Sequence, residues 1–142
     1  FIQLVQLPLS IYDQRMLRSG LINKLKENGI SIHTRSLFLQ GLLLKRSKLP
    51  LFISKKMHQH HSKLISYLDK KNISLLDASI AFIKNFSELE AFIVGISCKQ
   101  DLIEIINSFF NVENNVQLLN DLKYFYWNNE NDIDPRLWKI DN

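Results

Sequence analysis

The sequence predicts an α/β fold in which parallel strands alternate with helices. Three apolar runs have the length of strands, and each is followed by a segment with apolar residues at helical spacing. This order indicates parallel strands joined by right-handed helical crossovers. The pattern alone is compatible with an open doubly wound sheet and with part of an eight-stranded barrel.

The first strand and helix are expected within residues 3–29. Residues 3–9 form an apolar run limited by Pro8, which is too short for a helix. Asp13 is expected to cap a single helix of about four turns, and Gly29 is expected to end it in the left-handed conformation. The apolar residues of this helix recur at helical spacing: Met16, Leu17, Leu21 and Leu25.

The second unit begins with an alternating pattern. Ile30, Ile32 and Thr34 alternate with polar neighbours, which predicts a strand. That strand leads into a glycine-containing loop at residues 35–41. Residues 54–71 then suit a helix with one exposed face. Its apolar positions are Met57, Leu64, Ile65 and Leu68.

The third unit follows a strongly apolar helix that is expected to start at Ser74, because Asp77 stands three residues later. Residues 91–96 are continuously hydrophobic, the pattern of a parallel strand buried on both faces. Ser97 and Gln100 form a capping-box pattern that opens the next helix. The residues expected on the buried stripe of that helix are Leu102, Ile103, Ile106 and Phe110.

Two parts are expected along the chain. Residues 1–110 hold the three strand and helix units, and residues 111–142 form a polar, asparagine-rich tail with a short helix near residues 116–125. Three parallel strands with nothing on either edge would leave backbone groups unpaired. A complete barrel takes about 250 residues, and the first residues read as a strand already under way. We therefore expect the barrel to be completed by an N-terminal part upstream.

Composition narrows the function classes. The chain has 142 residues, 46% hydrophobic and 23% charged, which is ordinary for a globular domain. Its apolar runs are far shorter than the roughly 20 residues of a membrane span. The net charge of +4 is scattered rather than concentrated on a nucleic-acid-binding module, so no nucleic-acid partner is expected. A single cysteine, Cys98, favours a reducing cytoplasmic setting.

Several polar residues have both a functional and a structural interpretation. His58 and His61 lie one helical turn apart, but no carboxylate or cysteine joins them or His60 at ligand spacing, so a solvated helix face is expected and no metal site. His33 is expected to pack between sheet and helix. Cys98 lies near a helix start without a neighbouring histidine, which favours a structural role.

Three stretches, taken together, resemble the last third of aldo/keto reductases. They are VQLPLSIYDQR at 5–15, RSLFLQGLL at 35–43, and VGIS at 94–97 with Leu102 and Glu104. The closing DPRLW at 134–138 is similar to bacterial members. The resemblance covers essentially the whole chain and implies strands six to eight of a partial TIM (β/α)8 barrel, three parallel β/α units plus a C-terminal helical tail.

The resemblance also implies a cofactor site. Gln6 would bond the nicotinamide carboxamide, which needs both a donor and an acceptor. Arg35 stands where many members place an aromatic ring against the nicotinamide. The segment that wraps the pyrophosphate matches Ser36, Leu37, Leu39, Gln40 and Gly41. Ser97, with Cys98 and Lys99, would hold the phosphate on the adenosine ribose at a helix start. The cofactor implied is NADP, with NAD possible.

This last site departs from the family pattern. The usual glutamine before Leu102 is Asp101, and the usual asparagine after Glu104 is Ile105. The arginine often found near Cys98 is absent, and Lys99 would have to compensate for it. The cofactor preference of the site is therefore open.

The activity implied for the whole protein is hydride transfer from the nicotinamide to an aldehyde or ketone, with proton delivery by a tyrosine and no metal. The family's catalytic tyrosine, lysine, aspartate and histidine lie on the first four strands, so no catalytic residue is assigned here and this chain alone is not expected to turn over. Two alternatives remain. One is a barrel that has lost catalysis and serves as a binding or sensing module. The other is a flavodoxin-type domain, for which an acidic cluster at the strand ends is missing.

Overall fold

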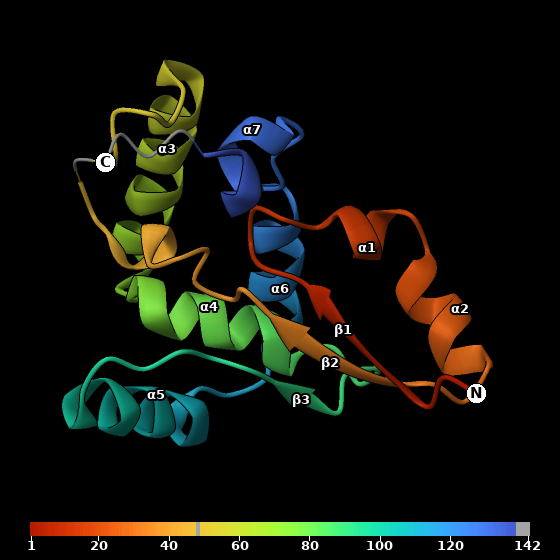
Figure 1. Ribbon diagram of the computed structural model, residues 1–142. Coiled ribbons are helices and arrows are strands. Elements are labelled where there is room, and N and C mark those ends of the chain that lie inside the picture. Colours follow the sequence, from red (N-terminus) through yellow and green to blue (C-terminus); the bar gives the residue numbers. More distant parts are fainter. Residues whose placement is uncertain (48, 139–142) are drawn as a thin grey trace.

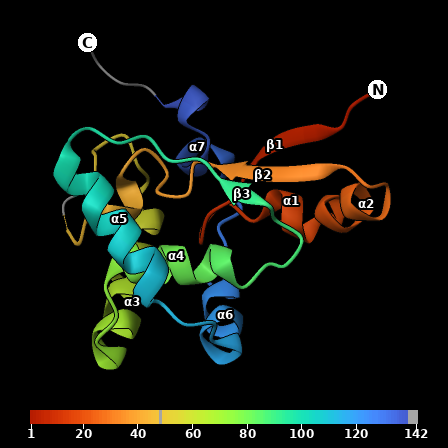
Figure 2. The same ribbon diagram turned by 90° about the horizontal axis from the view of Figure 1, so that it is seen from below.

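Three parallel strands form the sheet of the computed structural model, which describes residues 1–47 and 49–138. The strands are β1 (Leu4–Pro8), β2 (Ser31–Arg35) and β3 (Ala91–Phe92). They lie side by side in chain order, with β2 in the middle (Figures 1 and 2). This confirms the predicted α/β class. The last four residues of the predicted tail, 139–142, lie outside the described residues.

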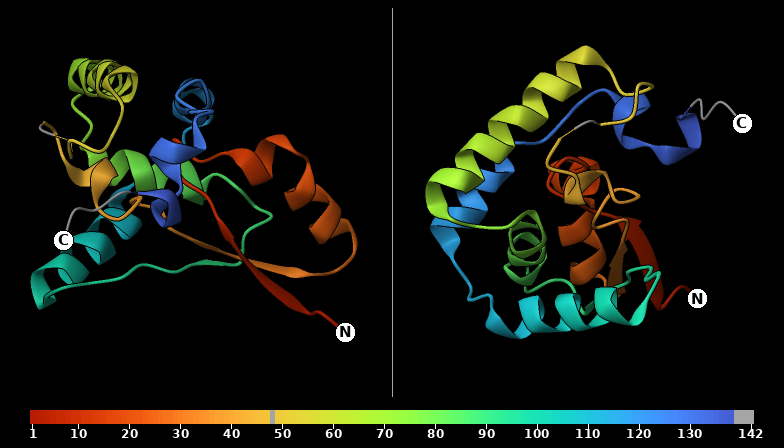
Figure 3. Two further views of the ribbon diagram at one scale, coloured as in Figure 1. Left: turned by 45° about the horizontal axis from the view of Figure 1, so that its top comes forward. Right: turned by 90° about the vertical axis from the view of Figure 1, so that its left-hand side faces the viewer.

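Helices connect and cover the strands. They are α1 (Arg15–Arg18), α2 (Leu21–Glu27), α3 (Lys55–Lys71), α4 (Leu75–Lys84), α5 (Lys99–Asn111), α6 (Val116–Lys123) and α7 (Glu130–Ile133), with 3-10 turns η1 (Leu42–Leu44) and η2 (Pro135–Leu137). In Figure 3, α4 lies between α3 and α5. Because α4 packs against three helices and η1, most of its residues are buried, and it is the centre of the core. No helix in the described ranges has the length and apolar character of a membrane span.

The two faces of the sheet differ. Ile32 and Thr34 on β2 are buried, whereas His33 between them is half-buried and Arg35 is exposed. In the parallel register Gln6 lies opposite His33, and Gln6 is exposed. Since alternate residues of a strand point to the same face, Gln6, His33 and Arg35 share the face that the helices of this chain leave uncovered.

Thr34 has a buried hydroxyl, Oγ1, with no hydrogen-bond partner among the described residues. A buried hydroxyl without a partner loses its hydration and gains nothing in return. Replacing Thr34 with the isosteric valine is expected to raise the free energy of unfolding by about 1 kcal/mol. Urea denaturation would measure the change. A loss of stability in Thr34→Val would show that the hydroxyl has a partner in solution.

The strand predicted at 91–96 is much shorter than expected. Only Ala91 and Phe92 pair with β2, and the chain leaves the sheet after a last bond from the Ile93 amide to the Thr34 carbonyl at 2.7 Å. Ile93 and Ile96 are 42% and 48% exposed, so the prediction of burial on both faces was wrong. The physical reason is that β3 has a paired neighbour on one edge only, and one of its faces has no covering layer in this chain.

The helix expected after β1 is broken in two. Gly20 has a φ of 74° and separates α1 from α2, so the single four-turn helix was wrong. Gln14 stands at the N-cap position and makes no side-chain capping bond, but Asp13 Oδ1 accepts from the amide of Arg15, the first residue of α1, at 3.3 Å. The Asp13 carboxylate also accepts from Nε and Nη2 of Arg15 at 2.9 and 2.8 Å. Gly29, with a φ of 69°, follows the end of α2 as predicted.

Two predicted helix starts are confirmed. Ser54 precedes α3, and its Oγ accepts from the amide of Met57 at 3.2 Å. Ser74 precedes α4, and its Oγ accepts from the amide of Asp77 at 3.0 Å. In both cases the hydroxyl satisfies an amide that has no partner within the helix, which is why these sequence positions fix where the helices begin.

The start of α5 differs from its prediction. Cys98, not Ser97, is the N-cap, and the residue three places later is Asp101. One oxygen of the Asp101 carboxylate, Oδ2, accepts from the amides of Ser97 and Cys98 at 2.9 and 3.2 Å. An ionised carboxylate is a stronger acceptor for these amides than a hydroxyl or an amide side chain, so Asp101 takes the role expected of the pair Ser97 and Gln100.

The predicted buried stripe of α5 is the exposed one. Leu102, Ile103, Ile106 and Phe110 are 40%, 39%, 43% and 77% exposed. The side of α5 that packs on the body carries Ile105 and Ser108, which are buried. The helix therefore has two apolar faces, and the one with the larger side chains is uncovered in this chain.

The tail folds back onto the loop after β1. The amide of Trp127 donates to the carbonyl of Tyr12 at 2.9 Å. Asp132, which is 2% exposed, accepts from the amide and the Oγ of Ser54, both at 2.8 Å. It also accepts from Trp127 Nε1 at 2.9 Å and from Asn129 Nδ2 at 3.0 Å. These bonds join α7 to the first turn of α3.

Two histidines of α3, His60 and His61, face the protein rather than solvent. His61 is 3% exposed, with Nδ1 2.7 Å from the Tyr12 hydroxyl and Nε2 2.5 Å from the Lys45 carbonyl oxygen. His60 lies 2.9 Å from the Phe125 carbonyl and packs on the ring of Trp127. The expected solvated face was therefore wrong for His60 and His61, whereas His58 is half-buried. The described residues contain no group of three metal-ligating side chains.

Candidate functional site

A groove opens at the carboxyl ends of β2 and β3, where the chain leaves the sheet. It has a volume of about 930 Å³. One wall is the segment from Arg35 to Leu44, and the other is formed by residues 93–97 and the first turns of α5. Ligand sites in parallel α/β folds lie at this end of the strands, because the loops that follow the strands meet there.

The loop after β2 is held in an unusual backbone conformation. Ser36, Leu39 and Gln40 have positive φ values of 62°, 47° and 53°, and Gly41 has 78°. A non-glycine residue in this region costs on the order of 1 kcal/mol or more. Three such residues so close together point to a functional constraint on this loop.

Gly41 and Gly95 both line the groove and offer a matched comparison. Neither would place an added Cβ within 4 Å of another atom, but only Gly41 has a positive φ. Gly41→Ala is therefore expected to lower the free energy of unfolding by about 1 kcal/mol, whereas Gly95→Ala is expected to leave it unchanged or raise it slightly. Equal effects in thermal unfolding would contradict a conformational role for Gly41.

The structure brings together most of the predicted site residues. Those that line the groove are Arg35, Ser36, Leu37, Gln40, Gly41 and Ser97. Leu39 is 1% exposed and belongs to the core instead. Cys98 and Lys99 are exposed at the start of α5, outside the groove lining. Gln6 lies two strands from β3, on the uncovered face that it shares with Arg35.

The groove also contains charged residues that were not predicted as ligands. Arg46 lines it and pairs with Asp69. Asp101 and Glu104 stand on the α5 wall. The bond from the Ser97 amide, reinforced by the Cys98 side chain and amide, holds the pKa of Asp101 below its usual value. In the sequence, Asp101 stood out only because it replaces the glutamine that is usual before Leu102 in the aldo/keto reductases that the chain resembles.

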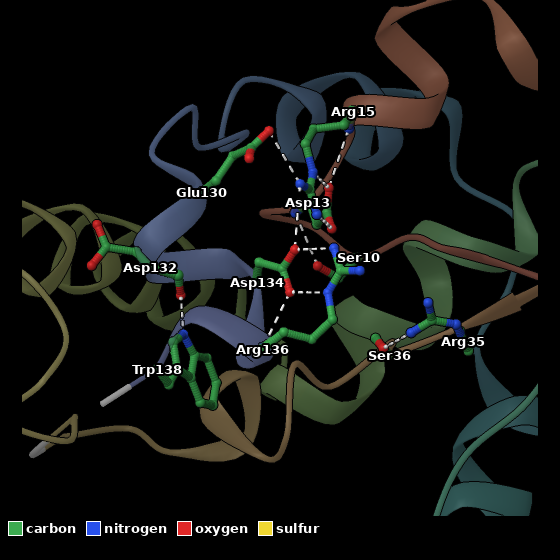
Figure 4. A network of polar contacts seen from close by, with 10 residues as sticks. All are labelled: Ser10, Asp13, Arg15, Arg35, Ser36, Glu130, Asp132, Asp134, Arg136 and Trp138. Atoms are coloured by element: carbon green, nitrogen blue, oxygen red, sulfur yellow. Dashed lines mark hydrogen bonds and ion pairs between the residues drawn. The ribbon is translucent and has the colours of Figure 1, made fainter. Parts of the chain in front are cut away.

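A second polar network lies at the carboxyl end of β1 (Figure 4). Arg136 donates from Nε to Asp134 at 2.9 Å, and Arg15 reaches Glu130 at 3.3 Å and Asp134 at 3.8 Å. The hydrogen bonds from Arg136 lower the pKa of Asp134 to about 2. This network joins α7 and η2 to the loop after β1. Figure 4 shows Arg35 and Ser36 apart from it, with Arg35 Nη1 donating to Ser36 Oγ at 3.3 Å.

No protein-family model and no curated protein match the chain. Its backbone is nevertheless similar to solved structures of aldo-keto reductases. The aldo-keto reductase AKR11C1 from Bacillus halodurans in its apo form is 15% identical, with a TM-score of 0.69 over 88% of this chain and 44% of that chain. Its holo form is 15% identical, with a TM-score of 0.72 over 86% and 42%. The thermostable aldo-keto reductase Tm1743 in complex with the inhibitor epalrestat is 15% identical, with a TM-score of 0.62 over 86% and 39%.

The chain thus spans less than half the length of the solved structures that it matches. At this level of identity the likeness shows the fold. The three parallel strands and their helices have the arrangement of part of a (β/α)8 barrel, which confirms the predicted partial barrel over the doubly wound alternative.

Proposed function

We propose that this chain forms the cofactor-binding part of an aldo/keto reductase that reduces aldehydes or ketones, with a nicotinamide dinucleotide in the groove. The observation that carries the proposal is the strained loop from Ser36 to Gly41, which lies at the carboxyl end of β2 and faces residues 93–97 across the groove. Barrel enzymes place their sites at this end. The bound dinucleotide would supply the hydride.

The groove suits the charge and shape of a dinucleotide. Among the described residues, the amides of Gln40 and Gly41 donate to no backbone carbonyl, so they are available to phosphate oxygens. Arg35 adds a positive charge on the same wall and a planar group that can stack on a ring. Gln6 shares the sheet face of Arg35 and would bond the carboxamide.

We further propose that the open edges of the sheet pair with the remaining strands of the barrel. In the described sheet β1 and β3 each pair with β2 alone, so the outer edge of each is open, and the apolar residues Leu4 on β1 and Ile93 after β3 are 43% and 42% exposed. The uncovered face of α5 includes Phe110 at 77% exposure, and the preceding residue, Phe109, packs its ring against Phe92 of β3 with the centroids 5.6 Å apart. The five remaining strands of the barrel and their helices would cover both edges and this face of α5. They would also supply the catalytic acid.

Hydrogen exchange tests the pairing of the edges. In the native protein, the backbone amides of β1 and β3 are expected to exchange slowly on both sides of each strand, because both sides would be paired. In a recombinant chain of residues 1–142 the outer amides should exchange much faster. Equal rates in the two samples would contradict the pairing.

Turnover tests the activity. The native protein is expected to oxidise reduced nicotinamide dinucleotide in the presence of aldehydes or ketones. Arg35→Leu is expected to raise the KM for the dinucleotide by about tenfold, whereas Arg18→Leu, which removes an exposed arginine stacked on Tyr126, should not. Binding without turnover would favour the sensing module, and the absence of binding would overturn the proposal.

A further inference from the structure

The two walls of the groove carry charges of different sign. The β2 wall supplies Arg35, whose guanidinium contacts Ser36. The α5 wall supplies the carboxylates of Asp101 and Glu104, three residues apart on one helix. A ligand that fills the groove must therefore present negative charge to the first wall and hydrogen-bond donors to the second.

Asp101 places a carboxylate at the start of α5, where it takes two of the amides that could otherwise bind an anion. The first amides of a helix attract anions, because they have no partner within the helix and lie at the positive end of its dipole. At α5 the amides of Ser97 and Cys98 already donate to Asp101, at 2.9 and 3.2 Å. These bonds keep the pKa of the carboxyl low, so it is negatively charged at neutral pH.

Glu104 adds a second carboxylate on the same wall. Its Oε1 accepts from Gln100 Nε2 at 2.9 Å, which fixes the side chain along the helix. A carboxylate accepts hydrogen bonds and repels a phosphate group, whereas the hydroxyls of a ribose are donors that suit it. Two carboxylates on this wall therefore favour a ribose with free hydroxyls over one that carries a phosphate.

We propose that Asp101 determines the cofactor preference of the groove, in favour of NAD(H) over NADP(H). The inference rests on the proposed function, since it requires the dinucleotide to lie in this groove. It corrects the expectation that Ser97, Cys98 and Lys99 hold a ribose phosphate, because the amides of the first two are taken by Asp101 and Lys99 lies outside the groove lining.

Calorimetric titration of the native protein with NADH and NADPH tests the inference. NADH is expected to bind at least about tenfold more tightly. Asp101→Asn keeps an oxygen acceptor for the two amides and removes the charge, so it is expected to strengthen NADPH binding by about tenfold and to change NADH binding by less than about twofold. Glu113→Gln removes an exposed charge near the far end of α5 and should leave the ratio unchanged.

The outcomes separate the two proposals. Equal or tighter binding of NADPH by the native protein, or an unchanged ratio in Asp101→Asn, would overturn the role of Asp101 and leave the proposed function standing. Binding of neither dinucleotide would overturn the proposed function as well. If Asp101→Asn lowers the thermal unfolding midpoint sharply, Glu104→Gln provides the same test, because Glu104 is exposed. The expected gain in NADPH affinity is then smaller.

Discussion

Asp132→Ala is expected to lower the free energy of unfolding by about 3 to 5 kcal/mol. The carboxylate is buried and accepts from both groups of Ser54, from Trp127 and from Asn129. Its removal leaves several donors without a partner and separates α7 from the first turn of α3. Hydrogen bonds to a charged acceptor are stronger than average, and each unpaired buried donor adds a penalty.

Urea denaturation followed by tryptophan fluorescence measures this loss, and Trp127 reports on the site directly because its Nε1 donates to Asp132. Asp69→Ala is the matched control. Asp69 also accepts from a side chain, Arg46, but its own side chain is 51% exposed. An exposed ion pair contributes about 0 to 1 kcal/mol. Similar losses in the two variants would contradict the assigned role of Asp132.

The stability of the protein is expected to fall as the pH drops below about 6.5, because of His61. Burial lowers the pKa of His61 from its ordinary value, and the neighbouring His58 and His60 lower it further, against a smaller opposing effect of the Lys45 carbonyl. Burial also raises the pKa of the Tyr12 phenol, so this hydroxyl remains a donor to Nδ1 of neutral His61. Nε2 then donates to the Lys45 carbonyl.

The sign of the dependence follows from the lowered pKa. Above about pH 6.5 the imidazole is neutral in the folded and the unfolded protein, and its contribution is fully present. As the pH falls toward the folded-state pKa, the unfolded chain takes up a proton that the folded protein does not. The free energy of unfolding therefore decreases, with a slope that approaches about 1.4 kcal/mol per pH unit.

Denaturation midpoints between pH 8 and pH 5 would measure this slope. His61→Gln keeps a donor and an acceptor but does not titrate, so its stability should depend less on pH below pH 6.5. This variant should also be less stable than the native protein at pH 8. His58→Gln should keep the steep profile, because His58 is only half-buried. Parallel profiles for the native protein and His61→Gln would show that another group carries the dependence.

The sequence predicted those parts of the fold that depend on local chemistry. The caps at Ser54 and Ser74 were found because a hydroxyl next to free amides stabilises a helix start wherever it occurs. Gly29 was found because its backbone conformation favours glycine. The order of strands and helices followed from the periodicity of the apolar residues.

The errors concern which surface is covered. Residues 91–96 and the stripe from Leu102 to Phe110 are apolar enough to be buried, but this chain supplies nothing to cover them. His61 was missed because its two partners, Tyr12 and Lys45, are distant in sequence. The break at Gly20 was missed because the apolar spacing continues across it.

The resemblance pointed to segments that line both walls of the groove, and their role in binding a cofactor stays a prediction. The left-handed conformations of Ser36, Leu39 and Gln40 have no signal in the residue types, since these residues seldom adopt them. The side chain of Leu39, which was expected at the cofactor site, is in the core together with those of its neighbours Leu37 and Phe38.

The bond between the Trp127 amide and the Tyr12 carbonyl has a consequence for biosynthesis. A ribosome synthesises the chain from its amino terminus, so Tyr12 is made on the order of ten seconds before Trp127. During that interval β1 and the loop after it have no tail to cover them, and His60 lacks the ring of Trp127. This corner of the protein therefore folds only after Trp127 has been translated, and the apolar residues of β1 stay without this cover until then.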